Sequence, residues 1–169
     1  MFKKISVNMP KFELDQIIGS LTHSYAHGNF QEYNIKDINY LTNELKNNIN
    51  FGIRPHKVNI TKLVNEGANT PHTDNWPVAL NCYLHARDDT TFFYTPKTAI
   101  KEAGLRAYDL ADLTVSNSFI ACTGDWYLLE TKTIHNVVSA EKTNYRLLLR
   151  FVWDKHSFDE ITNSITIPN

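Results

Sequence analysis

The sequence predicts a mostly β protein, an antiparallel sandwich or barrel of about eight strands with helices packed on one of its sheets. From residue 57 onward, short runs rich in β-branched and aromatic residues follow one another at near-regular spacing. Before residue 57, apolar residues recur three and four positions apart, which is the spacing of amphipathic helices. Helices on one face of an antiparallel sheet are a stable arrangement of layers.

Two helices are predicted in the N-terminal part. Residues 12–21 and 38–49 both carry apolar side chains at helical spacing, and Asp37 is a suitable N-cap for the second segment. Later in the chain, residues 96–113 interrupt the strands with Ala, Lys, Glu and Leu, which favour a short helix.

The strands are predicted from β-forming residues and from the turns between them. Residues 65–67 and the pair Gly124–Asp125 supply two of these turns. The segment around His72 is counted as a strand. The other predicted strands are residues 58–64, 78–84, 90–95, 114–122, 126–131, 135–139 and 145–153.

The chain of 169 residues is long enough for one domain with its own hydrophobic core. We expect a single domain over residues 1–169, with a helical support region at 1–56, the β core at 57–153 and a C-terminal tail at 154–169. The content of 42% hydrophobic and 21% charged residues is ordinary for a soluble globular protein.

Charge and hydropathy give no support for a nucleic-acid or membrane partner. The formal net charge is −1, so no basic field attracts nucleic acid. No apolar run approaches the roughly 18 to 20 residues of a membrane helix, and Lys3 and Lys4 are not followed by the apolar segment of a secretory signal. Cys82 and Cys122 lie in apolar strand-like runs, which favours free thiols in a reducing compartment. We therefore expect a cytoplasmic protein, and the sequence does not indicate its oligomeric state.

A His-x-Asp motif, His72 and Asp74, lies in a segment predicted as a strand. Residues two apart on a strand point to the same face, so the imidazole and the carboxylate are expected to project together. They are two of the three ligands of the facial triad that binds Fe(II) and leaves coordination positions open. With seven histidines in the chain, such a spacing also arises by chance.

His135 and Arg146 make the pattern more specific. His135 lies between two strand-like runs late in the chain, and Arg146 is near the start of the apolar strand predicted at residues 145–153. A buried arginine is costly unless it has an anionic partner, and a bound dicarboxylate would supply one.

The order of His72, Asp74, His135 and Arg146 resembles the Fe(II)/2-oxoglutarate-dependent oxygenases. The resemblance covers residues 58–153 and implies the family's double-stranded β-helix, a jelly roll. It implies that His72, Asp74 and His135 are the catalytic metal ligands and that Arg146 binds the distal carboxylate of 2-oxoglutarate. The implied activity is hydroxylation of a C–H bond with Fe(II), 2-oxoglutarate and O2, releasing succinate and CO2.

Further positions match the family less specifically. Tyr83 has the spacing from Asp74 of a family tyrosine that helps to hold the cosubstrate carboxylate. Asn81 shares the predicted strand face of Tyr83, and both also suit an ordinary sheet. Many members carry a tyrosine or arginine on the first core strand. Here Lys62 is the residue that we expect to take its place in substrate binding.

Arg150 lies on the same face as Arg146 if their strand is regular. Two inward arginines exceed what one distal carboxylate requires. We expect Arg150 either to hold an anionic group of the substrate or cosubstrate, or to pair with a nearby acid such as Glu130 or Asp154.

Two other functions remain open alongside the oxygenase. One is a cupin-like metal protein that catalyses isomerisation, lysis or hydrolysis without 2-oxoglutarate, although the usual cupin ligand set has more histidines and a glutamate. The other is a jelly-roll binding module without catalysis. For the oxygenase we expect a small molecule, such as a free amino acid, or a peptide side chain as the substrate.

Overall fold

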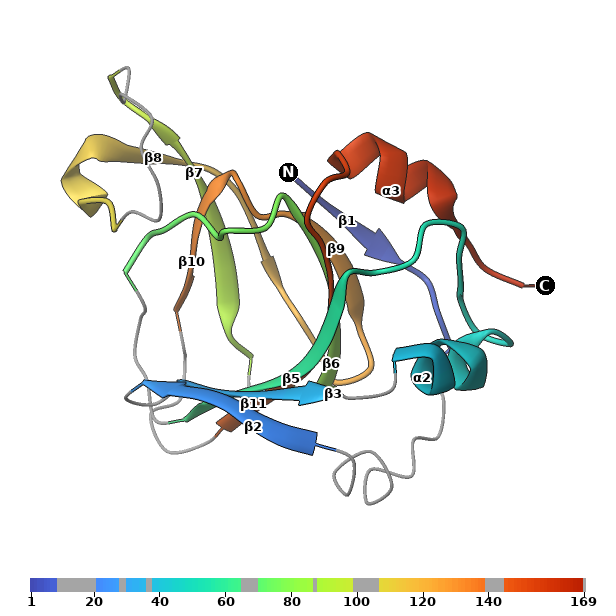
Figure 1. The fold of residues 1–169 in the computed structure, drawn as a ribbon. Coiled ribbons are helices and arrows are strands. Elements are labelled where there is room, and N and C mark those ends of the chain that lie inside the picture. Colours follow the sequence, from blue (N-terminus) through green and yellow to red (C-terminus); the bar gives the residue numbers. More distant parts are fainter. Residues whose placement is uncertain are drawn as a thin grey trace.

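Two β-sheets face one another in the computed structural model (Figure 1), which describes residues 1–8, 21–27, 30–35, 38–64, 70–86, 88–98, 107–138 and 145–168. The large sheet has seven strands in the order β1-β9-β6-β11-β5-β3-β2, and the small sheet has three in the order β10-β7-β8. The strands are β1 Phe2–Ile5, β2 Leu21–His27, β3 Phe30–Ile35, β4 Asn50–Phe51, β5 Lys57–Val64, β6 Val78–His85, β7 Thr90–Pro96, β8 Leu113–Ile120, β9 Trp126–Glu130, β10 Ile134–Val138, β11 Tyr145–Trp153 and β12 Ile165–Thr166.

Between β5 and β11 the chain passes repeatedly from one sheet to the other. β5, β6, β9 and β11 lie in the large sheet, while β7, β8 and β10 lie in the small sheet. Neighbouring strands of this core pair antiparallel. This alternation is the topology of a jelly roll, so the mostly β class predicted from the sequence is confirmed at that level.

One of the expected core strands is reduced to isolated bridges. His72 pairs with His135 of β10 through two backbone hydrogen bonds of 2.9 Å and also bridges to Ala107, but its neighbours form no ladder. Pro71 and Pro77 flank this segment and lack the N–H donor that a strand needs. The strand predicted around His72 is therefore wrong, and a loop carries this part of the site.

The alternation of side chains along β11 separates an outer core from an inner one. Leu149, Phe151 and Trp153 point to the outer face of the large sheet and are buried there. Leu148 points to the inner face and packs in a cluster that also contains Phe93 of the small sheet. Because strand side chains alternate with a period of two, the inner face of the large sheet is free to present a second set of residues between the sheets.

Helices α2 (Ile38–Leu45) and α3 (Phe158–Ser164) supply apolar side chains to the outer core. Leu45 and Ile161 are fully buried in it. A capping box starts α3, since Ser157 Oγ accepts from Glu160 N and the Glu160 carboxylate accepts from Ser157 N. No helix in the described part of the chain is both long enough and apolar enough to cross a membrane.

Within the described residues of the N-terminal region, the second predicted helix is shorter than the sequence predicts. α2 begins at residue 38 as expected but ends at Leu45 rather than at residue 49, while residues 12–20 and Asp37 lie outside the described residues. β1 extends the large sheet beyond β9, and β3 and β2 extend it beyond β5. β1, β2 and β3 are short and contain many polar residues. Their strand conformation follows from hydrogen bonding to the edges of the large sheet, which outweighs their weak local preference for any one secondary structure.

The C-terminal segment expected as a tail contains α3 and β12, and β12 pairs with β4. Gly52 permits this contact, because a Cβ at that position would lie 2.8 Å from the Ser164 carbonyl oxygen. The Gly52 N–H instead donates to the same oxygen at 2.9 Å. This pairing anchors the chain after β11 against the segment that precedes β5.

Candidate metal centre

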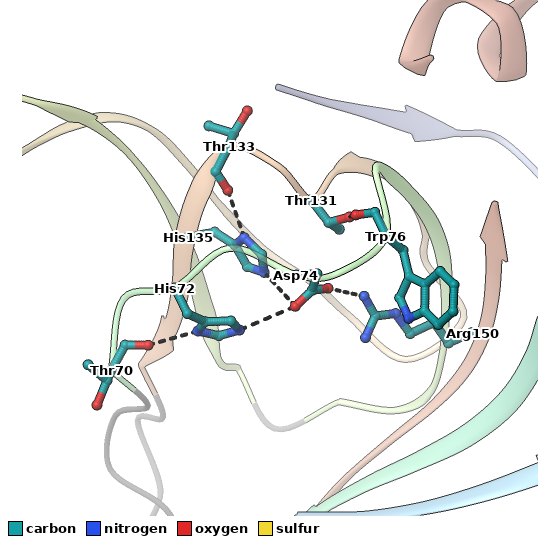
Figure 2. Close-up of polar contacts among 8 residues, drawn as sticks. All are labelled: Thr70, His72, Asp74, Trp76, Thr131, Thr133, His135 and Arg150. Atoms are coloured by element: carbon teal, nitrogen blue, oxygen red, sulfur yellow. Dashed lines mark hydrogen bonds and ion pairs between the residues drawn. The ribbon is translucent and has the colours of Figure 1, made fainter. Parts of the chain in front are cut away.

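His72, Asp74 and His135 meet beside the space between the two sheets (Figure 2). The ligand atoms that they offer all lie within 4.8 Å of one another. Two backbone hydrogen bonds join His72 to His135, and Asp74 N donates to Thr131 O at 2.9 Å. The main chain therefore fixes the position of His135 relative to His72 and Asp74, which precede it by about sixty residues.

Both imidazoles use the same ring nitrogen to contact the main chain. Nδ1 of His72 lies 2.8 Å from Thr70 O, and Nδ1 of His135 lies 2.9 Å from Thr133 O (Figure 2). A carbonyl oxygen only accepts, so each Nδ1 carries the hydrogen and donates it. Each neutral ring then presents the lone pair of Nε2 toward Asp74.

The two Nε2 atoms converge on Oδ1 of Asp74. The distances are 3.5 Å from His72 and 3.9 Å from His135, which exceed the roughly 2.7–3.2 Å of an N–H···O hydrogen bond. Two nitrogen lone pairs and a carboxylate oxygen that share one space are best satisfied by a cation among them. Two imidazoles and one carboxylate form the donor set of a facial triad, so these residues fit a divalent metal ion.

The charge states follow from burial and from the immediate neighbours. Burial alone raises the pKa of Asp74, but the charge of Arg150 and the polar contact with His72 outweigh it and hold that pKa far below its usual range. Burial lowers the pKa of His135, which keeps its imidazole neutral. Burial also lowers the pKa of His72, but its contacts with Asp74 and with the Thr70 carbonyl outweigh it, so the net pKa is raised. A metal ion at this position would compete with a proton for Nε2 of His72.

Arg150 holds the second oxygen of the same carboxylate. Its Nη2 forms an ion pair with Oδ2 of Asp74, whereas Oδ1 faces the imidazoles (Figure 2). The two acids expected as partners bind elsewhere, Glu130 to the N-terminal amino group and Asp154 to a histidine. Arg150 therefore forms an ion pair, as expected, but its partner is Asp74 and not Glu130 or Asp154. Nη2 of Arg150 is consequently not free to hold a substrate anion.

A cavity of about 280 Å³ extends from the three ligands between the sheets. Asn81, Tyr83 and Arg146 line it from the large sheet, and Thr91 lines it from the small sheet. Burial raises the pKa of Tyr83, whose hydroxyl is hydrogen-bonded to Thr91 and Asn81. Within the described part of the chain, Oδ1 of Asn81 is buried and has no hydrogen-bond partner. The cavity thus brings these predicted cosubstrate residues together with the candidate metal ligands.

Arg146 marks the far end of this cavity. It precedes Arg150 by four residues on β11, which corresponds to roughly 13 Å of strand. Arg146 Nη1 lies 3.7 Å from Oδ2 of Asp89, and the two side chains are only 9% and 3% exposed. Sequence reasoning missed Asp89, because it stands among polar residues before β7 and only the stacking of the sheets reveals its partner.

Lys62 is the one predicted site residue that the structure does not bring to the cavity. Its neighbours on β5, Thr61 and Leu63, line the cavity, so Lys62 points to the opposite face of the strand. Its Nζ lies 5.0 Å from the centre of the Tyr145 ring. The strand register turns the Lys62 side chain away from the cavity, so the structure does not support its predicted contact with a substrate bound there.

No protein family profile and no curated protein sequence matches this chain. Among solved structures, the chain is similar to the vicilin of hazelnut, Corylus avellana, with a TM-score of 0.44, 9% identity, and 78% of this chain and 31% of that one covered. It is similar to the 7S globulin of Momordica charantia, with a TM-score of 0.49, 8% identity, and 82% and 33% covered. It is also similar to the oxalate decarboxylase of Bacillus subtilis, with a TM-score of 0.45, 9% identity, and 89% and 30% covered.

The chain spans about a third of the length of these three proteins. Identities of 8 to 9% and TM-scores below 0.5 assign neither a family nor an activity to it. The function must therefore be argued from the residues of the site.

Proposed function

We propose that this chain is an Fe(II)- and 2-oxoglutarate-dependent oxygenase that hydroxylates a C–H bond of a small molecule or a peptide side chain. The observation that carries the proposal is the convergence of His72 Nε2, His135 Nε2 and Asp74 Oδ1 at one end of a cavity. The same cavity is lined by Arg146. The candidate metal ligands and Arg146, which would pair with the distal carboxylate of 2-oxoglutarate, thus line the same small cavity.

The donor set favours Fe(II) over metals that prefer other ligands. Two imidazoles and one carboxylate leave three adjacent coordination positions for exogenous groups. The set contains no thiolate, and the free cysteines of the described chain, Cys82 and Cys122, are not among the clustered residues. Because the Asp74 carboxylate would occupy one coordination position of the metal, that position is not open to a halide. This favours hydroxylation.

The charges around the cavity balance a dicarboxylate. Arg146 and Arg150 contribute +2, and their partners Asp74 and Asp89 contribute −2, which sums to zero. A divalent metal ion raises the total to +2, which a dicarboxylate dianion neutralises. The cavity of about 280 Å³ lies near the lower end of ligand pockets, which start at roughly 300 Å³. A small dianion such as 2-oxoglutarate suits both the charge and the volume.

With metal, 2-oxoglutarate and O2 bound, the cofactors supply the oxidising chemistry and yield succinate and CO2. The residues of this chain would bind and orient the metal ion and the cosubstrate, and would enclose them in the cavity. Arg150 keeps Asp74 ionised and turned toward the metal position, while Thr70 and Thr133 fix the tautomers of the imidazoles. Asn81 offers an unpaired acceptor to a bound group.

One observation favours a metal enzyme that does not use 2-oxoglutarate. Arg146 already has an acidic neighbour, Asp89, so its burial does not require a bound dicarboxylate. A cupin-like isomerase, lyase or hydrolase is therefore the second candidate function. A non-catalytic jelly roll does not explain why three metal-ligating side chains converge.

Anaerobic titration with Fe(II) and 2-oxoglutarate separates these functions. The oxygenase is expected to develop a visible charge-transfer band that requires both components, and to release succinate once O2 and a substrate are added. His135→Ala should show neither signal. Stoichiometric Fe(II) binding without any band or 2-oxoglutarate affinity would favour the second candidate, and a panel of amino acids and peptides would identify the substrate class.

A further inference from the structure

The ion pair of Asp89 with Arg146 connects the two sheets at the end of the cavity away from the metal ligands. Asp89 immediately precedes β7 of the small sheet, and Arg146 lies on the inner face of β11 in the large sheet. Both side chains are almost completely buried. Two opposite charges withdrawn from water in this way interact strongly and are little screened by salt.

The geometry of the pair leaves Arg146 able to bind a second anion. Nη1 lies 3.7 Å from Oδ2 of Asp89, whereas charge-assisted hydrogen bonds are about 2.7–2.9 Å long. A guanidinium carries several N–H donors in a fixed fork. Within the described part of the chain, Nε of Arg146 is buried and has no hydrogen-bond partner, so the guanidinium keeps one donor for a further acceptor. A ligand carboxylate that reaches Arg146 must still approach the negative charge of Asp89.

We propose that Asp89 is a specificity-determining residue that lowers the affinity of the cavity for anions by acting as an internal counter-ion for Arg146. The inference rests on the proposed function, in which the distal carboxylate of the cosubstrate reaches Arg146. Asp89 makes this end of the cavity nearly neutral, so a dianion binds through the metal and Arg146 together and not through Arg146 alone. Binding of the cosubstrate is thereby coupled to the presence of the metal.

An orienting role for Asp89 predicts the opposite sign. If Asp89 only held the guanidinium in place, its removal would weaken anion binding, because Arg146 would lose its orientation. If Asp89 competes for the guanidinium, its removal strengthens anion binding. The direction of the change in affinity therefore decides between the two roles.

The test uses the full chain loaded with Zn(II), which supports no oxygen chemistry, and calorimetric titration with 2-oxoglutarate. Asp89→Asn is expected to bind 2-oxoglutarate about tenfold more tightly than the wild type, as removal of one competing charge-assisted contact implies. Its affinity for 2-oxobutanoate, which lacks the distal carboxylate, should stay within about twofold. Unchanged or weaker binding of 2-oxoglutarate overturns the inference.

Asp88→Asn is the matched control. It removes the same charge one residue away, and Asp88 is exposed with a φ of 58°, which asparagine adopts readily. It should leave both affinities unchanged. If Asp89→Asn does not fold, Asp89→Glu replaces it. Its longer carboxylate reaches closer to Arg146 and should weaken binding of 2-oxoglutarate, so tighter binding would overturn the inference.

A wild type that binds Zn(II) but not 2-oxoglutarate would overturn the proposed function and not the role of Asp89. Acetate titration of the metal-free protein, followed through the side-chain Nε–H resonance of Arg146, then tests that role. The Asp89→Asn variant should show a larger saturable shift at lower acetate concentration than the wild type. Equal shifts in the two proteins would show that Asp89 does not compete for the arginine.

Discussion

Arg150 binds the oxygen of Asp74 that the two imidazoles do not face. Nη2 pairs with Oδ2, whereas His72 and His135 approach Oδ1. One carboxylate is thus divided between an arginine and a candidate metal position. This arrangement explains an inward arginine next to a candidate metal ligand, and the following variant tests whether Arg150 positions Asp74.

Arg150→Gln should weaken metal binding by roughly 10- to 100-fold, the usual cost of losing a residue that orients a metal ligand. Without the arginine, burial raises the pKa of Asp74 and its rotamer is no longer held. Competition titration with a chromophoric chelator measures the affinity for Zn(II) or Fe(II). Arg54→Gln, which alters an exposed arginine outside the cavity, serves as the control. Equal affinities in the two variants would show that Arg150 does not position Asp74.

His72→Ala should abolish stoichiometric metal binding, because two remaining donors cannot form the triad. His56→Ala is the matched control, since His56 pairs with Asp154 and is not in the cluster of ligands. Elemental analysis after reconstitution and desalting gives the metal content of both variants. Full metal content in His72→Ala would place the metal elsewhere.

Arg146→Ala should raise the dissociation constant for 2-oxoglutarate by at least tenfold, since a charge-assisted hydrogen bond is worth about 1.5–3 kcal/mol. Tyr83→Phe should cost less, on the order of 1 kcal/mol, because it removes one neutral hydroxyl. Lys62→Gln should change nothing, because Lys62 points away from the cavity. Calorimetry on the Zn(II)-loaded variants measures all three. An effect of Lys62 as large as that of Arg146 would contradict the register of β5.

Ile161→Ala should destabilise the fold by about 2–5 kcal/mol, the range for truncating a large buried aliphatic side chain. Ile161 is fully buried between α3 and the outer face of the large sheet. The candidate metal centre lies beside the cavity between the sheets, so metal stoichiometry in the folded variant should match the wild type. Chemical denaturation and elemental analysis give the two quantities. Loss of metal at unchanged stability would contradict the separation of the two cores.

The strands of the core were largely predictable because their signal is local. The prediction of a strand at residues 145–153 matches β11 (Tyr145–Trp153), and β6 and β7 differ from their predictions only at their ends. Alternation of inward and outward side chains is a property of the strand itself, so one sequence suffices to find it. The types and order of the candidate ligands were also predictable from the sequence, because they depend only on residue identity and spacing.

The partners of the charged residues were decided by the tertiary structure alone. Periodicity places Arg146 and Arg150 on one face of β11, but it does not say which acids face them across the cavity. Asp89 reaches Arg146 from the segment just before β7 of the small sheet, and Asp74 reaches Arg150 from the loop that precedes β6. The loop at His72 and the outward direction of Lys62 likewise depend on flanking prolines and on strand register. The sequence determines which side chains a strand carries on each face. The stacking of the two sheets determines which residues those side chains contact, because ion pairs form through space between residues that are distant along the chain.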